Sequence, residues 1–379
     1  MTRTALINAR ALLPAGFRDD VCVVVEGSDI VAVSSAAPGD AEVVDLGGTT
    51  LVPGFIDSQV NGGGGRLFND DPSVETIAAI AAAHRNFGTT GLLPTLISDD
   101  LAVVERGIAA VDAAIESGVP GILGIHIEGP FLSPARRGIH AESKLLRLDD
   151  GMIDLLASAR RGRTLLTLAP ECATPGQIAR LVAAGVIVSA GHSDARYETV
   201  RTAIEHGLTG FTHLFNAMSQ LANRAPGMVG AALEDDSTFA GIIADGHHLH
   251  SATLRVAVRA KGVNRLMLVT DAMPSVGSDL PSFPLQGREI RRDGDTLHGD
   301  DGVLAGSTLT MDRAVRMMME QGRVSLQAAV TMASATPAAF LGIGDRTGAI
   351  VPGLRADLVV LDAALEVRES WIAGQRAII

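Results

Sequence analysis

The sequence predicts an α/β protein: a (β/α)8 TIM-like barrel with a small β-sandwich domain formed by both chain termini. From residue 51 onward, eight short apolar runs alternate with mostly helical spacers: FIDSQV, TGLLPTL, ILGIHIEG, LLTLAPE, VIVSAGH, GFTHLFN, AGIIADG and LMLVTDA. Eight such units favour a closed parallel barrel over an open sheet, because right-handed strand–helix crossovers wind round. Both ends of the chain instead show short strands broken by Gly and Pro, which predicts one flanking sandwich.

The elements are expected in a simple order along the chain. Residues 1–50 and 346–379 form the two parts of the sandwich, and residues 51–345 form the barrel. Helices are expected over residues 74–87 and 101–115. The long stretch 275–303 contains Gly, Pro and Asp, and is expected to be a loop or hairpin inserted after the eighth strand.

The glycine run 62–65 invites comparison with a phosphate-binding loop. A nucleotide-binding loop would continue into Gly-Lys-Ser/Thr, which does not follow here. The run is therefore expected to be a flexible turn that lets the backbone approach a metal or substrate.

Composition narrows the class of protein. The formal net charge of −12 argues against a general nucleic-acid or anionic-membrane binder. No run approaches the ~18 apolar residues that a membrane span needs, and the N-terminus has no signal-peptide pattern. The two cysteines lie in very different segments, as expected in a reducing compartment. We therefore expect a cytoplasmic, soluble protein.

Polar side chains stand where five of the apolar runs end. They are Gln59 with Asn61, Glu128, His192, His213 and Asp271. The carboxyl ends of barrel strands meet at one face of the barrel, so these side chains are expected to converge there. Alternation along a strand also places His126 and Glu128 on the same side.

Two histidines and one glutamate make a plausible catalytic metal site. Alone, the glutamate is equally well explained as a carboxylate at a turn, and a single histidine is more often a hydrogen-bonded core or surface residue than a ligand. Together, Glu128, His192 and His213 leave a coordination position for water, as catalytic zinc sites require. Asp271 could then carry the proton of that water, although Asp is also a common helix cap.

At this point the motifs resemble a known family. In order they are LVPGFID, GIHIEGPFLSPARRGIH, SAGHSDA, THLFNAM, APGMVGAAL, GIIADGHHLH, LVTDAM, LAGSTLTM and GLRADLVVLD. Over nearly its whole length the chain resembles the amidohydrolase superfamily, and within it the deacetylases of amino-sugar phosphates. The resemblance implies the same barrel and sandwich. It also implies that Glu128, His192 and His213 bind the metal, and that Asp271 and His140 are the catalytic residues.

The activity implied by the resemblance is specific. It is hydrolysis of the acetamide of N-acetyl-D-glucosamine 6-phosphate to glucosamine 6-phosphate and acetate, a step of amino-sugar catabolism. Three alternatives stay open: deacetylation of N-acetylgalactosamine 6-phosphate or another N-acyl compound, a non-catalytic amidohydrolase-like protein, and a barrel phosphatase or aldolase. The last would need a Schiff-base lysine or a two-carboxylate magnesium site, and no such lysine stands at a strand end.

The chain departs from many amidohydrolases at the end of its first barrel strand. Where those proteins have His-x-His for a second metal, Gln59 and Asn61 flank Val60. Amides are poor zinc ligands, and the lysine that others carboxylate on the fourth strand is missing too. We therefore expect a vacant second-metal position and one divalent metal ion per subunit. Zinc is the expected ion, and Fe2+, Mn2+ and Co2+ remain alternatives.

The resemblance also implies substrate contacts: Ile139, His140, Asn216, Ala217, Arg224, His248, Leu304, Ala305 and Gly306. His140 should reach the acetamido carbonyl or a neighbouring hydroxyl. Asn216 and Ala217 would bind phosphate, with backbone N–H groups at a following helix start. Arg224 would come from the neighbouring subunit, which requires a homodimer. His247 and His250 are expected to face solvent.

Overall fold

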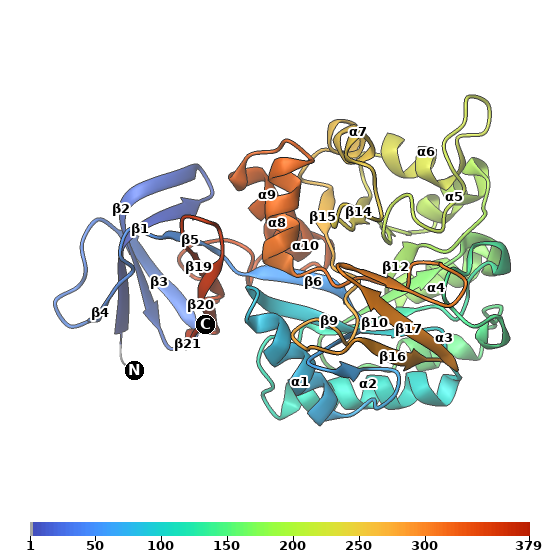
Figure 1. Ribbon diagram of the computed structural model, residues 1–379, viewed down its shortest axis with the longest axis horizontal. Helices are drawn as coiled ribbons and strands as arrows, with labels where there is room; N and C mark the ends of the chain where they lie inside the picture. The colour runs from blue at the N-terminus through green and yellow to red at the C-terminus, as the bar shows by residue number, and fades with distance from the viewer. Residues whose placement is uncertain (1–2) are drawn as a thin grey trace.

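The computed structural model describes residues 3–379, which form a large barrel and a smaller β domain beside it (Figure 1). The barrel sheet has eight strands, and adjacent strands are parallel. They are β6 (Phe55–Val60), β9 (Thr89–Ile97), β10 (Gly124–Glu128), β11 (Arg163–Leu168), β12 (Ile187–Ala190), β13 (Gly210–Phe211), β14 (Phe239–Ile242) and β15 (Leu266–Leu268).

The barrel closes between its first and last strands. Val60 forms a parallel bridge with Ala272, and the Asp271 N–H donates to the Gln59 carbonyl over 3.0 Å. Asp57 ties the same seam from inside, because its carboxylate accepts the Thr270 hydroxyl over 2.5 Å. The predicted fold class is therefore confirmed.

Helices cover the outside of the barrel. They are α1 (Val74–Arg85), α2 (Leu101–Glu116), α3 (Met152–Leu156), α4 (Pro175–Ala183), α5 (Tyr197–Glu205), α6 (Gly227–Glu234), α7 (Ser251–Lys261), α8 (Met311–Glu320), α9 (Leu326–Ala333) and α10 (Ala335–Phe340). Short 3-10 turns occupy Pro134–Arg136, Glu142–Lys144 and Pro170–Cys172. Helix α1 ends two residues before the expected position, since the chain turns sharply at Gly88, whose φ is +85°.

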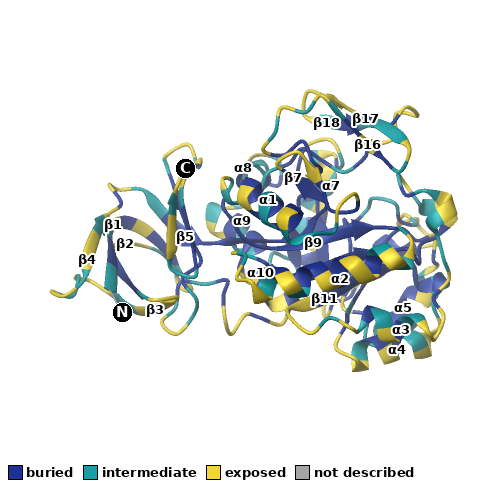
Figure 2. Cartoon of the chain, turned by 90° about the horizontal axis from the view of Figure 1, so that it is seen from below, coloured by how far each residue is buried: buried dark blue, intermediate teal, exposed yellow. Residues whose placement is uncertain are grey.

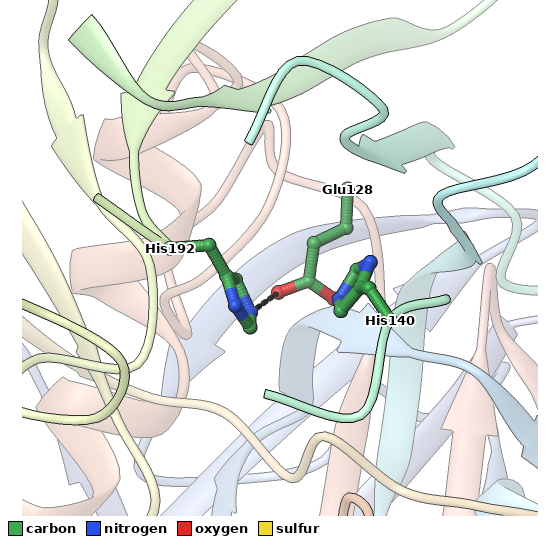
Figure 3. A group of neighbouring side chains, drawn as sticks. All are labelled: Glu128, His140 and His192. Carbon is green, nitrogen blue, oxygen red and sulfur yellow. Dashed lines mark ion pairs between the residues drawn. The ribbon is translucent and has the colours of Figure 1, made fainter. Parts of the chain in front are cut away.

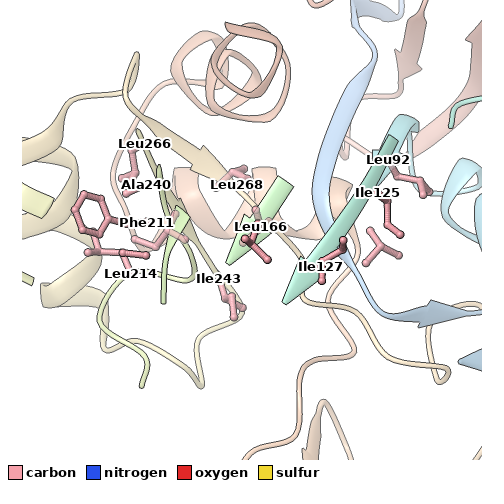
Figure 4. Close-up of a cluster of buried hydrophobic side chains, with 14 of the residues drawn as sticks. Leu92, Ile125, Ile127, Leu166, Phe211, Leu214, Ala240, Ile243, Leu266 and Leu268 are labelled. Atoms are coloured by element: carbon pink, nitrogen blue, oxygen red, sulfur yellow. The ribbon is translucent and has the colours of Figure 1, made fainter. Parts of the chain in front are cut away.

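The apolar core lies mainly between the strands and these helices. On β10, Ile125 and Ile127 are buried in this layer, while His126 and Glu128 alternate with them and point into the barrel. Figure 4 draws part of the layer around Ile125, Ile127 and Leu166. Figure 2 shows the barrel strands in the buried colour, with the outer faces of helices such as α2 exposed. Among the described residues, no helix is long and apolar enough to cross a membrane.

Both termini build the second sheet, which also has eight strands. They are β1 (Arg3–Leu13), β2 (Gly16–Glu26), β3 (Asp29–Ser34), β4 (Glu42–Asp45), β5 (Thr50–Pro53), β19 (Leu358–Leu361), β20 (Val367–Ile372) and β21 (Gln375–Ile378). Their apolar faces enclose a separate core that includes Val23, Leu358 and Trp371. Strand β5 pairs with β1 and β19, so the terminal sheet extends to residue 53. The boundaries at 50/51 and 345/346 remain a prediction.

The expected insertion after the eighth strand is a small three-stranded antiparallel sheet. It consists of β16 (Ser282–Leu285), β17 (Arg288–Asp293) and β18 (Thr296–His298). Phe283, Leu285 and Ile290 pack from it toward the barrel mouth.

The glycine run forms another hairpin, of β7 (Gly62–Gly63) and β8 (Arg66–Leu67). A Cβ on Gly62 would lie 2.8 Å from the Pro274 nitrogen. The close backbone approach is thus to the chain after β15, and the run does not line the cavity described below.

Candidate active site

The carboxyl ends of the barrel strands surround a cavity of about 240 Å³. Its walls contain most of the residues predicted for the site: Asn61, Glu128, Ile139, His140, His192, His213, Asn216, Ala217, His248, Asp271, Leu304 and Gly306. An apolar wall that carried no signal in the sequence completes it, made of Ile97, Ile243, Met273, Leu285 and Val303. Gln59 lies just beneath the cavity and is buried.

Three donor atoms form a tight triangle at the cavity floor. His213 Nε2 lies 3.0 Å from Glu128 Oε1 and 3.0 Å from His192 Nε2, and the third side, from His192 Nε2 to Glu128 Oε1, measures 3.3 Å. Tetrahedral zinc bonds of about 2.0–2.2 Å place neighbouring ligand atoms roughly 3.3 Å apart. The triangle therefore fits one divalent metal ion.

Glu128, His140 and His192 also form a compact group, with one possible ligand atom of each within 4.8 Å of the others. The carboxylate lies between the two rings (Figure 3). His140 and His213 thus compete geometrically for the role of third ligand.

A hydrogen bond to the far side of the His140 ring argues against His140 as the third ligand, and His192 shows the opposite arrangement. His140 Nδ1 accepts the Ser98 backbone N–H over 3.2 Å, so its own proton is on Nε2, toward the cavity. His192 Nδ1 faces the Arg136 carbonyl at 2.8 Å and must donate, which leaves the Nε2 lone pair for a metal. His140 is therefore built as a hydrogen-bond donor and His192 as a ligand. No partner among the described residues holds the buried Nδ1 of His213.

The amides of Gln59 and Asn61 hold the two carboxylates of the site. Asn61 Nδ2 donates to Asp271 Oδ1 over 2.6 Å. Gln59 Nε2 lies 3.2 Å from the same oxygen and 3.1 Å from Glu128 Oε1. Amide N–H groups thus stand between two carboxylates, where other amidohydrolases are expected to hold a cation.

Burial and charge set the protonation of the site. Burial and the nearby charge of Glu128 raise the pKa of Asp271 to about 6. Burial alone would raise the pKa of Glu128 too, but hydrogen bonds from His192 and His213 hold it well below its usual range. Burial, together with the neighbouring His192, lowers the pKa of His140 to about 3, so this ring is neutral at pH 7. The site offers one carboxylate that can exchange a proton near neutrality and one that stays ionised.

Three site residues adopt the left-handed backbone conformation. The φ angles are +47° for His192, +36° for His213 and +51° for Asp271. Such angles are uncommon and costly for residues other than glycine, and they cluster at functional sites. Each residue lies two or three positions after the end of a barrel strand, so the strained turn directs its side chain across the barrel mouth.

Not every predicted substrate residue lines the cavity. Ala305 is buried behind Leu304 and Gly306, and Arg224 is exposed on a loop outside the cavity wall. The expected helix start after Ala217 is wrong: the segment turns, with φ of +51° at Ala217, and α6 begins only at Gly227. His247 and His250 are exposed, as expected.

Sequence reasoning missed the residues that orient the site. Ser98 holds His140, and hydroxyls inside the barrel form a chain beneath Glu128: Thr167 Oγ1 lies 2.7 Å from His126 Nε2 and 2.6 Å from Thr212 Oγ1. Ser and Thr are common in any sequence, so only their inward alternation on strands could have indicated them.

Comparison with known proteins agrees with this geometry. Residues 50–377 match the model of the Amidohydrolase family. The chain belongs to the amidohydrolase family. Amidohydrolases are metal-dependent hydrolases, and both the triangle of donor atoms and the Glu128–His140–His192 group offer ligands for such a metal.

Individual relatives are similar over most of their length. The N-acetylgalactosamine-6-phosphate deacetylase of Shewanella sp. (strain ANA-3) is 50% identical over 86% of this amidohydrolase and 82% of its own chain. The N-acetylglucosamine-6-phosphate deacetylase of Pasteurella multocida superposes with a TM-score of 0.96 at 32% identity, covering 100% of both chains. A variant of the Mycobacterium smegmatis N-acetyl-D-glucosamine-6-phosphate deacetylase, in complex with N-acetyl-D-glucosamine 6-phosphate, gives 0.92 at 32% identity and the same coverage.

Proposed function

We propose that this amidohydrolase removes the acetyl group of N-acetyl-D-glucosamine 6-phosphate, giving glucosamine 6-phosphate and acetate. The observation that carries the proposal is the cavity that combines the Glu128–His192–His213 triangle with the Asp271 carboxylate and the His140 N–H. Amide hydrolysis needs those three functions: activation of water, proton transfer and polarisation of the carbonyl. Full-length similarity to deacetylases of this sugar phosphate supports the substrate.

Glu128, His192 and His213 would hold one divalent metal ion, and zinc is the ion that a His2Glu set suits. When bound, the ion supplies Lewis acidity, which lowers the pKa of water and polarises a carbonyl group. Iron, manganese and cobalt accept the same donors, so the supply of each metal in the cell also determines which ion is bound.

Asp271 would move the proton. Its Oδ1 is held by the Asn61 and Gln59 amides, so Oδ2 is left to take a proton from the attacking water. The proton then passes to the departing amine nitrogen. With a pKa of about 6, the carboxylate can both accept and release a proton near neutral pH.

His140 would bind the acetamide oxygen through its Nε2–H. A neutral imidazole is a hydrogen-bond donor that does not lose its proton during the reaction. The Ser98 N–H at Nδ1 fixes that orientation before substrate arrives, so no reorganisation is needed at the transition state.

The sugar phosphate would lie against the outer wall of the cavity, formed by Ile139, Asn216, Ala217, Leu304 and Gly306. A phosphate also favours a guanidinium partner. Arg224 of a second copy would supply it, so we propose a homodimer.

The cell compartment follows from cysteine use. Cys22 and Cys172 are buried and unpaired. Two free thiols suit a reducing compartment, and we propose the cytoplasm.

N-acetylgalactosamine 6-phosphate is a second candidate substrate. The specific observation in its favour is the 50% identity to a deacetylase of that epimer. The two sugars differ only at C4, and the cavity wall offers both apolar and polar groups.

Acetate release from both epimers, measured beside metal content per chain, tests the proposal. We expect about one metal ion per chain and a kcat/KM for the glucosamine epimer in the ordinary enzymatic range of 10⁴ M⁻¹s⁻¹ or more, roughly. A higher kcat/KM for the galactosamine epimer would transfer the assignment to the second candidate. Absence of acetate from both sugars by metal-loaded protein would refute the deacetylase proposal.

A further inference from the structure

Asp245 lies in the loop between β14 and α7 and is only 5% exposed. Its Oδ1 accepts the backbone N–H groups of His247 and His248, over 2.8 and 2.9 Å. Its Oδ2 lies 2.6 Å from His248 Nδ1. This aspartate lies in the motif GIIADGHHLH, which gave it no role, yet its carboxylate is fully engaged beside a cavity residue.

These contacts decide which ring nitrogen of His248 carries the proton. Burial alone would raise the pKa of Asp245, but the hydrogen bonds from His248 and His247 hold it below its ordinary value. An ionised carboxylate can only accept, so Nδ1 must be protonated. His248 lines the cavity, and its remaining polar atom is Nε2.

We infer that Asp245 is a positioning residue that fixes His248 with its Nε2 lone pair toward the cavity, as the acceptor for a hydroxyl group of the sugar. This inference rests on the proposed function, because it takes a sugar phosphate as the ligand. Apart from the two proposed metal-binding histidines, the cavity wall then presents two imidazoles with opposite polarity, His140 and His248. His140 donates to a carbonyl, and His248 accepts from a hydroxyl.

The variant Asp245→Asn reverses the polarity of the contact. Its amide oxygen remains with the two backbone N–H groups, so the NH2 group faces Nδ1 and moves the ring proton to Nε2. A substrate hydroxyl then meets a donor, although it can reorient to accept. We expect KM to rise about tenfold, with kcat within about twofold of the parent value.

Asp235→Asn is the matched control. Asp235 makes the same turn, in which Oδ1 accepts the N–H groups of Ser237 and Thr238 over 2.9 Å, but it holds an arginine and no cavity residue. We expect its KM to equal that of the parent protein, even if its melting temperature falls.

A double-mutant cycle separates positioning from general damage. In a His248→Ala background, Asp245→Asn should change KM by less than about twofold, because its effect passes through the ring. An unchanged KM in the single variant, or an equal loss in both backgrounds, would overturn the inference.

Nitrogen-15 NMR of histidine-labelled protein tests the tautomer without any turnover. The His248 signals, assigned by their loss in His248→Ala, should show a protonated Nδ1 and an unprotonated Nε2 in the parent protein. The opposite tautomer, or an imidazolium at pH 7.5, contradicts the inference, and this holds even if Asp245→Asn fails to fold. The expected tautomer without release of acetate from either sugar would instead reject the proposed function alone.

Discussion

His140 and His192 show how much chemistry a single hydrogen bond decides. Both are buried histidines beside Glu128, and their ring centroids lie 4.5 Å apart. One ring receives a backbone N–H at Nδ1 and the other faces a backbone carbonyl there. The first can therefore donate into the cavity, and the second can bind a metal ion. Residue type alone could not have separated these roles.

Asp271→Asn tests the proton carrier at the same scale. The amide keeps the size of the side chain but cannot take a proton from water, so we expect kcat to fall by about 10³-fold or more. Metal content should stay near that of the parent protein, because Asp271 lies outside the Glu128–His192–His213 triangle. Elemental analysis and acetate release measure the two effects. A turnover near that of the parent protein would remove Asp271 from the mechanism.

At the scale of elements, the closing seam of the barrel contains an unusual carboxylate. Burial raises the pKa of Asp57 to about 7, although Thr270 and Gln59 donate to it. Its ordinary pKa when unfolded is near 3.9. The folded state thus binds more protons between these values, and the stability of the protein falls as pH rises from about 4 to about 7.

Asp57→Asn should remove that dependence. The free energy of unfolding of the variant should increase relative to the parent protein across this pH window, by up to roughly 4 kcal/mol. Denaturant unfolding at pH 4.5 and pH 7.5 measures the difference. Asp235→Asn is the control, because hydrogen bonds from Ser237 and Arg201 overcome burial and lower the pKa of Asp235. The free energy of unfolding of this variant should decrease relative to the parent protein as pH rises. If the free energy of unfolding of Asp57→Asn and of the parent protein changed with pH in parallel, folding would not raise the pKa of Asp57, and the prediction would be wrong.

Strand β10 positions Glu128 and begins at a residue that must be glycine. Gly124 has a φ of +152°, and a Cβ there would lie 1.9 Å from the Arg163 carbonyl oxygen on β11. Gly124→Ala must push the two strands apart, so we expect a loss of about 3 kcal/mol and weaker metal binding.

Gly176→Ala is the control for this change, because nothing lies within 4 Å of its Cβ position. It should leave the melting temperature unchanged or slightly higher. Thermal unfolding measures the stability of both variants, and metal titration measures their metal affinity. Equal behaviour of the two would contradict the close approach of β10 and β11.

At the scale of the whole molecule, no arginine among the described residues of the single chain lies in the cavity wall. If Arg224 acts across a homodimer, co-expressed Arg224→Ala and Asp271→Asn chains should recover about a quarter of parental activity, because one site in each mixed dimer is complete. Light scattering should give the mass of two chains. Arg224 acting within its own chain predicts no recovery in the mixture.

Much of the fold could be predicted from the sequence, because it depends on the local alternation of apolar runs and helical segments. Apolar runs that end in Gln59, Glu128, His192, His213 and Asp271 alternate with helical spacers, and parallel strands place their ends together. The sequence alone was less reliable at the ends of elements. Helix α1 stops early at a left-handed glycine, and the residues after Ala217 turn instead of starting a helix. Such endings depend on single backbone angles, which leave no periodic signal.

The sequence by itself therefore determined the barrel, its terminal β domain and the set of groups at the strand ends. Only the tertiary structure decided what those groups can do. Ser98 precedes His140 by 42 residues and Arg136 precedes His192 by 56, and these distant contacts assign the protons of both rings. Gln59 and Asn61 likewise donate to Asp271 only because closure of the barrel brings its first and last strands together. Secondary structure follows local periodicity, whereas tautomer, pKa and hydrogen-bond polarity depend on neighbours that only folding brings together.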